Sequence, residues 1–315
     1  MSTAFFSHPD FRLHHNGARH PERPTRLEAI ETHLKENEIW QKLRHEKFSA
    51  ADESQLEYCH HPALIEQIKT LAQNGGGQID GDTRVTEVSF DVAKLAVGAA
   101  IGAVDGVLSG DFNNAFVASR PPGHHAESTR AMGFCLFNNV AIGARVATAE
   151  LGLDRVLIVD WDVHHGNGTQ DSFWEDPQVG FFSLHRYPFY PGTGSAAETG
   201  AGAGLGTTVN LPITLGTSRR EILTRFSQSL GKFADRFRPQ LLLISAGFDA
   251  HHQDPIGSLG LESEDFAALT RVVRELAAEH CEGKMVSVLE GGYHPQALAE
   301  CIDLHWRGLQ SVTER

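Results

Sequence analysis

The sequence predicts an α/β fold built on one doubly wound, mostly parallel sheet with helices on both faces. Three observations predict it. Short apolar runs alternate with longer helical stretches, polar motifs follow the apolar runs, and 315 residues with 41% hydrophobic content suffice for a large core. Alternation of strands and helices over most of a chain is typical of this fold class. We therefore expect residues 1–315 to form one domain.

Five apolar runs are predicted to be buried strands, because parallel strands covered on both faces are apolar along their length. In chain order they are 115–118, 155–159, 179–184, 241–244 and 285–289. The stretches between them predict helices at 90–108, 138–151, 219–237 and 263–280. Two Gly-rich segments are predicted as loops. They are 73–83, near the rim of a crevice, and 192–206, which lacks the Gly spacing of a nucleotide-binding loop.

A polar motif follows each predicted strand. The motifs lie at 119–125, 160–167, 183–185, 246–249 and 290–293. Ligands of open α/β sheets bind outside the carboxyl ends of the strands. The five segments therefore indicate one shared crevice.

Composition excludes several classes of partner. A net charge of -13 argues against a surface that binds DNA or RNA. No apolar run approaches the roughly 20 residues that a membrane helix needs, and residues 1–12 lack the pattern of a secretory signal. The four cysteines are widely spaced, which fits a reducing compartment. We expect a cytoplasmic protein.

The segment 159–168 carries the first candidate metal ligands. Residues two apart on an extended strand share a face, so Asp160, Asp162 and His164 are expected to point the same way. Catalytic zinc usually takes three protein ligands and leaves one position open. Asp249, directly beyond the apolar run 241–244, is a good candidate for a ligand from elsewhere. Zinc held by Asp162, His164 and Asp249 would activate a water and polarise an amide carbonyl, which is the chemistry of amide hydrolysis.

Two adjacent histidines and a tyrosine are candidates for proton transfer and for stabilising the oxyanion. His124 or His125 could take a proton from the attacking water and later protonate the leaving amine. Tyr293 is a candidate donor to the oxyanion, and Gly291 and Gly292 before it would let the backbone pass close to a substrate. The alternatives are that the histidines only cap a tight turn and that Tyr293 is a turn residue.

These residues strongly resemble the histone deacetylase family, in particular its class II and bacterial amidohydrolase members. The matching motifs, in order, are RPPGHH (120–125), GFCLFNN (133–139), DWDVHHGN (160–167), SLH (183–185), YPGT (190–193), AGFD (246–249) and LEGGY (289–293). The resemblance covers nearly the whole chain. It implies one deacetylase catalytic domain with the arginase/deacetylase fold, a parallel sheet of about eight strands with flanking helices.

The resemblance assigns roles to the catalytic residues. It implies zinc ligands Asp162, His164 and Asp249, with His125 as general base and acid and His124 as its electrostatic partner. Tyr293 matches the carbonyl-polarising tyrosine, and Asp160 matches the carboxylate that orients His124. Asn167 stands beside His125 where class I enzymes carry Asp, and a neutral partner would leave His125 more readily neutral.

The resemblance also implies potassium sites and substrate contacts. A structural K⁺ would be held by carbonyls of Asp160, Asp162, His164 and Leu184, the Ser183 hydroxyl and an Asp160 carboxylate oxygen. A second K⁺ would involve Phe173, Asp176 and Val179. The walls of an acyl-lysine tunnel match Gly133, Phe134 and Tyr190, with core packing of the aromatics as the alternative. Asp82 is the candidate rim carboxylate. Arg26 resembles an arginine of the product-release channel, with a surface ion pair as the alternative.

Three rival functions remain to be weighed. Arginase-like ureohydrolases hold two manganese ions, and the order Asp160-x-Asp162-x-His164 with His251 in place of a second-metal carboxylate favours one zinc instead. Acetylpolyamine amidohydrolases are closer, but polyamine-selective relatives often place Glu at the position of Ile256, where it meets a second ammonium. A catalytically weak acyl-lysine binding protein is the third, and the presence of Tyr293 and both histidines argues against it.

We therefore predict a zinc-dependent deacetylase that acts on an acyl-lysine peptide or protein, or on an acylated small amine. The sequence does not decide the acyl group, the natural substrate or the relevance of histones. Homo-oligomers occur among such relatives, and the oligomeric state of this chain is likewise open.

Overall fold

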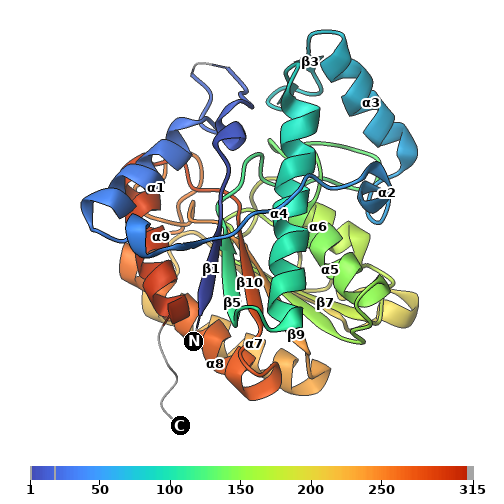
Figure 1. Ribbon diagram of the computed structural model, residues 1–315. Coiled ribbons are helices and arrows are strands. Elements are labelled where there is room, and N and C mark those ends of the chain that lie inside the picture. Colours follow the sequence, from blue (N-terminus) through green and yellow to red (C-terminus); the bar gives the residue numbers. More distant parts are fainter. Residues whose placement is uncertain (1, 18, 311–315) are drawn as a thin grey trace.

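The protein, described here by a computed structural model for residues 2–17 and 19–310, is built around an eight-stranded parallel sheet (Figure 1). Its strand order is β2-β1-β5-β10-β9-β6-β7-β8, and every pairing is parallel. In that order the strands are Arg44–His45, Thr3–Phe6, Asn114–Val117, Met285–Leu289, Leu241–Ala246, Val156–Asp160, Val179–Arg186 and Thr208–Ile213. A small antiparallel hairpin joins β3 (Gly77–Gln78) to β4 (Arg84–Val85).

Helices cover both faces of the sheet. One face is covered by α4 (Ser89–Ser109) and α5 (Asn139–Ala149), and the other by α1 (Thr25–Glu36), α7 (Arg219–Phe237), α8 (Ser263–His280) and α9 (Pro295–Gln310) (Figure 1). The remaining helices are α2 (Glu53–Leu56), α3 (Pro62–Gln73) and α6 (Asn167–Ser172), with 3₁₀ turns η1 (Pro9–Arg12), η2 (Trp40–Lys42) and η3 (Gly202–Gly204). This arrangement confirms the predicted fold class.

Local sequence explains where the helices start and stop. The Asn138 side chain accepts a hydrogen bond from Ala141 N at 3.1 Å and so begins α5. Ser218 does the same for Glu221 N at the start of α7, and Arg238 ends that helix in a left-handed conformation. Such side-chain caps satisfy backbone N–H groups that the first helical turn leaves free.

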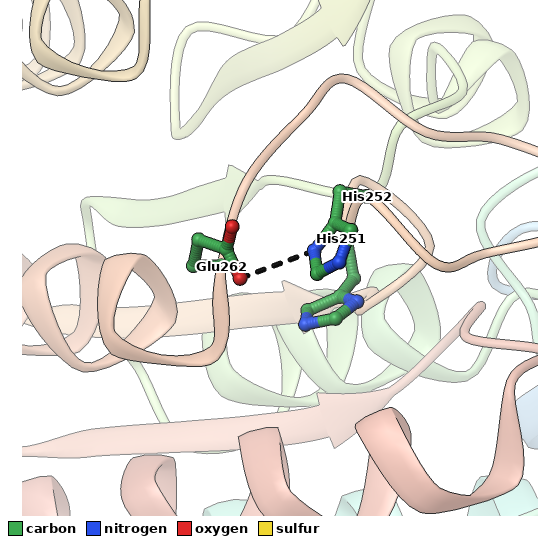
Figure 2. Close-up of side chains that lie close together, drawn as sticks. All are labelled: His251, His252 and Glu262. Atoms are coloured by element: carbon green, nitrogen blue, oxygen red, sulfur yellow. Dashed lines mark ion pairs between the residues drawn. The ribbon is translucent and has the colours of Figure 1, made fainter.

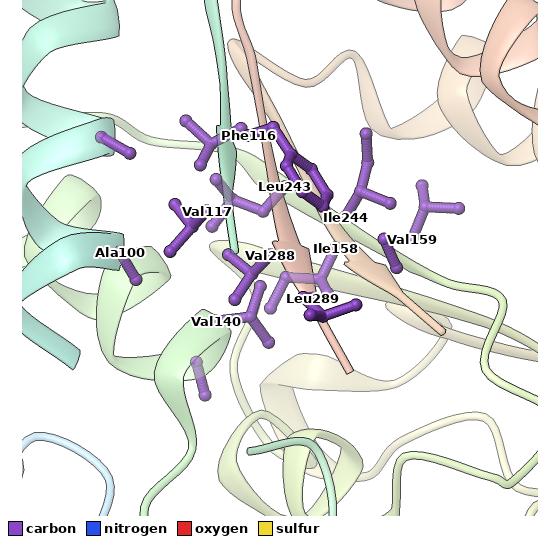
Figure 3. Close-up of a cluster of buried hydrophobic side chains, with 14 of the residues drawn as sticks. Ala100, Phe116, Val117, Val140, Ile158, Val159, Leu243, Ile244, Val288 and Leu289 are labelled. Atoms are coloured by element: carbon purple, nitrogen blue, oxygen red, sulfur yellow. The ribbon is translucent and has the colours of Figure 1, made fainter. Parts of the chain in front are cut away.

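The central strands and the helices above them form the main core. Figure 3 shows strand residues Phe116, Val117, Ile158, Val159, Leu243, Ile244, Val288 and Leu289 gathered with Ala100 of α4 and Val140 of α5. All of them are buried. Full burial of a Leu, Ile, Val or Phe side chain contributes about 1.5–3 kcal/mol, so this core fixes the strands whose carboxyl ends carry the polar motifs.

The five apolar runs all form strands of the sheet, and every strand end lies within two residues of the predicted one. Strands β1, β2 and β8 complete the sheet outside those runs. The loop predicted at 73–83 is partly wrong, because it includes the end of α3 and strand β3. The segment 192–206 is a loop apart from the turn η3.

One membrane criterion also differs from the expectation. Helix α4 has 21 residues and is long and apolar enough, by length and composition, to cross a membrane. However, 67% of its most apolar window is buried inside the fold, and core helices pass the same test. The helix contacts β5, β10 and α5 and serves as a core element. The cytoplasmic location stays a prediction.

Candidate active site

Three potential metal ligands converge at the carboxyl ends of β6 and β9. Asp162, His164 and Asp249 are buried, and their ligand atoms all lie within 4.8 Å of one another. His164 Nδ1 lies 3.0 Å from Asp162 Oδ1 and 3.2 Å from Asp249 Oδ2. A tetrahedral zinc site with bonds of about 2.0–2.1 Å has edges of about 3.3 Å. The two separations are therefore close to the ligand spacing of such a site.

Asp249 provides a test of whether these residues fit a cation. Its Oδ1 accepts a hydrogen bond from Val163 N at 2.8 Å, whereas its buried Oδ2 accepts none from the described residues. A buried carboxylate oxygen without a donor is costly unless a cation or another ligand occupies its lone pairs. The donor set, with this buried oxygen next to His164 Nδ1, fits a divalent zinc.

The backbone that carries two of these ligands differs from the predicted extended strand. Strand β6 ends at Asp160, so Asp162 and His164 lie in the turn beyond it rather than on an extended strand. Asp160 Oδ1 accepts from Asp162 N at 3.0 Å, and Asp162 Oδ1 accepts from His164 N at 2.9 Å. Short carboxylate side chains commonly stabilise turns in this way. Asp160 is consequently not one of the three clustered ligands.

The charges in the cluster depend on one another. Burial and the neighbouring Asp162 carboxylate raise the pKa of Asp249 to about 7. Burial disfavours a charged His164, but Asp162 and Asp249 together raise its pKa to about 9. Metal binding would therefore displace protons from these groups at neutral pH.

The two adjacent histidines have opposite electrostatic character. His124 Nδ1 lies 3.0 Å from Asp160 Oδ2. Burial alone would lower the pKa of His124, but the Asp162 and Asp160 carboxylates raise it to about 10. Burial, followed by the neighbouring His124 and His164, holds the pKa of His125 well below its usual value. His124 is thus a cation at neutral pH and His125 a neutral base.

Tyr293 lies beside the cluster at the end of β10. Its ring meets the Phe134 ring edge-on at 5.7 Å, and the Arg26 guanidinium lies 5.0 Å from its centroid. Burial, followed by the Asp249 carboxylate, raises the pKa of Tyr293 well above its usual value, so the hydroxyl keeps its proton. Arg26 Nε donates to Gly292 O at 2.7 Å. Arg26 is buried, which contradicts the surface ion-pair alternative.

Two buried carboxylates that sequence reasoning missed hold the catalytic loops. Glu290 Oε2 accepts from Gly123 N at 2.7 Å and from His124 N at 3.2 Å, which ties the end of β10 to the histidine turn. Asp254 Oδ2 accepts from Tyr293 N at 2.7 Å. An available signal for Glu290 was its place directly after an apolar strand, whereas the contact of Asp254 is long-range and has no local signal.

The predicted tunnel walls lie around the histidines. The Tyr190 ring lies edge-on to His125 at 5.2 Å and to His164 at 6.0 Å. Gly133 has φ of +56°, and a Cβ there would lie 2.4 Å from His125 Cδ2, so only glycine fits. Phe189, which the sequence analysis did not single out, stacks on His164 with ring centroids 5.2 Å apart.

The two predicted rim residues lie on different loops. Asp82 is exposed, and its neighbour Thr83 accepts a hydrogen bond from Phe134 N at 3.1 Å, which brings this loop to the tunnel wall. Ile256 is 38% exposed, and its N–H donates to Asp254 Oδ1 at 2.9 Å. Asp254 thereby links Ile256 to Tyr293.

The residues predicted to hold the first potassium lie on β6, on β7 and in the turn after β6. Asp160 of β6 is in register with Ser183 of β7, and both are buried next to Leu184. At the second position Phe173 and Val179 are buried, and the Asp176 carboxylate pairs with Arg145. Both potassium sites stay predictions.

Comparison with known proteins agrees with this geometry. Residues 20–309 match the family model of the histone deacetylase domain. A probable deacetylase of Archaeoglobus fulgidus is 40% identical, over 93% of this chain and 82% of its own length. Human polyamine deacetylase HDAC10 is also 40% identical, over 89% of this chain and 43% of its own length.

A solved structure shows the same fold. The HDA15 HD domain superposes with a TM-score of 0.93 at 36% identity, and the match covers 98% of this chain and 89% of that one. The two relatives are named a probable deacetylase and a polyamine deacetylase. On this sequence, fold and site the chain belongs to the histone deacetylase family and is an amide hydrolase.

Proposed function

We propose that this protein is a zinc-dependent deacetylase that removes an acyl group, such as acetyl, from the side-chain amine of lysine in a peptide or protein. The observation that carries the proposal is the buried Asp249 Oδ2, which accepts no hydrogen bond from the described residues and lies 3.2 Å from His164 Nδ1. This set of ligand atoms lies beside a neutral histidine and a protonated tyrosine. A metal that activates water, a general base and a donor to the oxyanion are together sufficient for metal-assisted amide hydrolysis.

Zinc would be held by Asp162, His164 and Asp249, and when bound it would supply Lewis acidity toward a water and the substrate carbonyl. His125 is neutral, so it can accept the proton of the attacking water and later deliver a proton to the leaving lysine amine. Tyr293 can donate its hydroxyl proton in a hydrogen bond to the oxygen that gains negative charge. His124, as a buried cation, favours negative charge nearby.

We further propose that K⁺ supports the turn that carries the zinc ligands. Its ligands would be the Ser183 hydroxyl, an Asp160 carboxylate oxygen and carbonyls of Asp160, Asp162, His164 and Leu184. The support is the register of β6 with β7, which brings buried Asp160 beside Ser183. A second K⁺ near Phe173, Asp176 and Val179 belongs to the same proposal.

The proposed substrate class is inferred from Ile256 and Asp82, the two predicted rim residues. Ile256 is apolar and partly exposed, so it offers no partner to the second ammonium of an acylated polyamine. Asp82, at the opposite loop, is available to accept from the backbone N–H of a peptide. These features favour acyl-lysine. The alternative, an acylated polyamine, is supported by the 40% identity to human polyamine deacetylase HDAC10.

The test is release of free amine by the zinc-loaded protein from an acetyl-lysine peptide and from N-acetylputrescine. Peptide turnover is expected, and Tyr293→Phe should lower kcat by about 10²–10³ because one oxyanion donor is lost. Preference for acetylputrescine would move the protein to the polyamine deacetylases. Zinc binding without turnover of either substrate would favour the acyl-lysine binding role and contradict the proposal.

A further inference from the structure

The side-chain amide of Asn167 lies between two partners at the start of α6. His125 Nδ1 is 2.7 Å from Asn167 Oδ1, and Asn167 Nδ2 donates to Glu127 Oε1 at 2.7 Å. Glu127 follows His125 by two residues on the same loop. The three side chains therefore form a hydrogen-bonded chain from the general base outward to a carboxylate.

The orientation of the Asn167 amide depends on this carboxylate. The two ends of an amide are nearly equal in shape, so hydrogen-bond partners decide which end faces which way. An ionised carboxylate only accepts, so Glu127 requires the NH₂ end. The other contacts of Asn167 Nδ2, to His125 O and Met132 Sδ, are both 3.5 Å and weak.

The amide orientation in turn fixes the tautomer of His125. Asn167 Oδ1 can only accept, so His125 Nδ1 must carry the ring proton and Nε2 keeps its lone pair. A flipped amide would place NH₂ against Nδ1 and favour the tautomer with the proton on Nε2. That tautomer cannot accept a proton from water at Nε2.

Glu127 is itself well held. Its Oε2 lies 3.3 Å from Arg130 Nε, its N–H donates to Arg130 O at 2.9 Å, and its carbonyl lies 3.0 Å from His60 Nδ1. The side chain is 30% exposed, and these contacts keep its other carboxylate oxygen next to Asn167.

We propose that Glu127 is a positioning residue, which orients the Asn167 amide and thereby holds His125 in the tautomer that can act as a base. The inference deepens the proposed deacetylase activity and rests on His125 being its general base. Glu127, which reaches His125 through the Asn167 amide, thus performs the orienting part of the task that Asp performs in a His–Asp pair, while the group hydrogen-bonded to the ring stays neutral.

The first test measures the tautomer and needs no substrate. Long-range ¹H–¹⁵N spectra of the zinc-loaded, ¹⁵N-histidine-labelled protein would report His125, assigned by the signals lost in His125→Gln. We expect a proton on Nδ1 in the wild type and in Glu127→Gln, whose amide oxygen can still accept. Glu127→Ala should shift the population toward Nε2, and Glu57→Ala, which removes an exposed glutamate elsewhere, should not. A wild-type proton on Nε2, or an unchanged tautomer in Glu127→Ala, overturns the inference.

The second test uses kinetics on the same variants. Glu127→Ala should lower kcat about tenfold, the low end of what loss of an orienting partner costs in metal sites, with KM unchanged. Glu127→Gln should restore most of kcat. In an Asn167→Asp background two carboxylates would face each other, so there Glu127→Gln should raise kcat. If the wild type turns over substrate and Glu127→Ala loses no kcat, this inference is wrong and the proposed function stands. If the wild type shows no turnover, the proposed function is wrong, and the tautomer measurement decides the role of Glu127.

Discussion

Among the described residues three clusters of histidine and carboxylate meet a simple proximity test for a metal site, and two of them differ clearly in burial and in hydrogen bonding. The site cluster is Asp162, His164 and Asp249, and the outer cluster is His251, His252 and Glu262 (Figure 2). In each, the ligand atoms lie within 4.8 Å of one another. Proximity alone therefore does not separate a metal centre from a polar contact.

The side chains of the outer cluster already have partners within the protein. His252 Nδ1 pairs with Glu262 Oε2 at 3.1 Å, and the two side chains are 41% and 39% exposed (Figure 2). His251 Nδ1 accepts from Gln253 N at 3.2 Å, and its Nε2 lies 3.3 Å from Ser263 Oγ. In the site cluster the side chains are at most 7% exposed and Asp249 Oδ2 has no donor among the described residues. Burial with an unsatisfied lone pair is what indicates a metal site here.

The largest effect should come from breaking the site cluster. Asp249→Asn replaces a charged ligand by a weak neutral one and should lower zinc affinity at least about a hundredfold, the upper end of the loss seen for partners outside the ligand set. His252→Ala should leave one zinc per chain. Metal analysis and competition with a chromophoric chelator measure both, with circular dichroism as the folding control. Zinc loss in His252→Ala and retention in Asp249→Asn would reverse the comparison.

The ion pairs of buried Glu22 and of exposed Glu262 should contribute differently to stability. Glu22 accepts from Arg120 Nη2 at 2.7 Å and from Arg26 Nη1 at 3.3 Å, and all three residues are buried. Glu22→Gln leaves the buried arginines with less compensation and should lower the free energy of unfolding by about 3–5 kcal/mol at pH 7. Glu262→Gln should change it by less than about 1 kcal/mol. Urea unfolding measures both.

The difference in unfolding free energy between wild type and Glu22→Gln should depend on pH. Burial raises the pKa of Glu22, but the Arg120 and Arg26 guanidiniums outweigh it and lower the pKa to about 2. A lowered carboxyl pKa contributes stability that is present above the unfolded value of 4.5 and is lost as the pH falls toward 2. The gap between wild type and Glu22→Gln should therefore shrink by about 3 kcal/mol over that range. A gap that is constant with pH would contradict the assignment.

Local patterns explain how far the sequence could predict this molecule. The central strands are apolar along their length and are followed by polar motifs, so β5, β6, β7, β9 and β10 and the polar cluster at their carboxyl ends could be predicted from the pattern alone. Strand β2, at two residues, is too short to show a pattern, and β1 and β8 were not predicted although they are as long as β5 and β9. Their place in the sheet depends on long-range pairing.

The site shows the same limit. Asp162, His164, Asp249 and Tyr293 follow apolar strands, and the structure brings them together as expected. The predicted common face of Asp160, Asp162 and His164 is wrong, because the chain turns after Asp160. Glu290 and Asp254 act through hydrogen bonds to residues at least 39 positions away, and no local pattern reports such contacts.

The smallest effect should come from His252→Ala. The His252–Glu262 pair is exposed and lies at the start of α8, where Glu262 N–H also donates to Asp265 Oδ2 at 2.8 Å. Exposed pairs contribute about 0–1 kcal/mol, and salt screens them. Urea unfolding of wild type and variant should therefore differ by less than about 1 kcal/mol in dilute buffer and by nothing measurable at high salt. If the outer cluster instead bound a metal, zinc would stabilise the wild type more than His252→Ala, and the contrast between the two clusters would not hold.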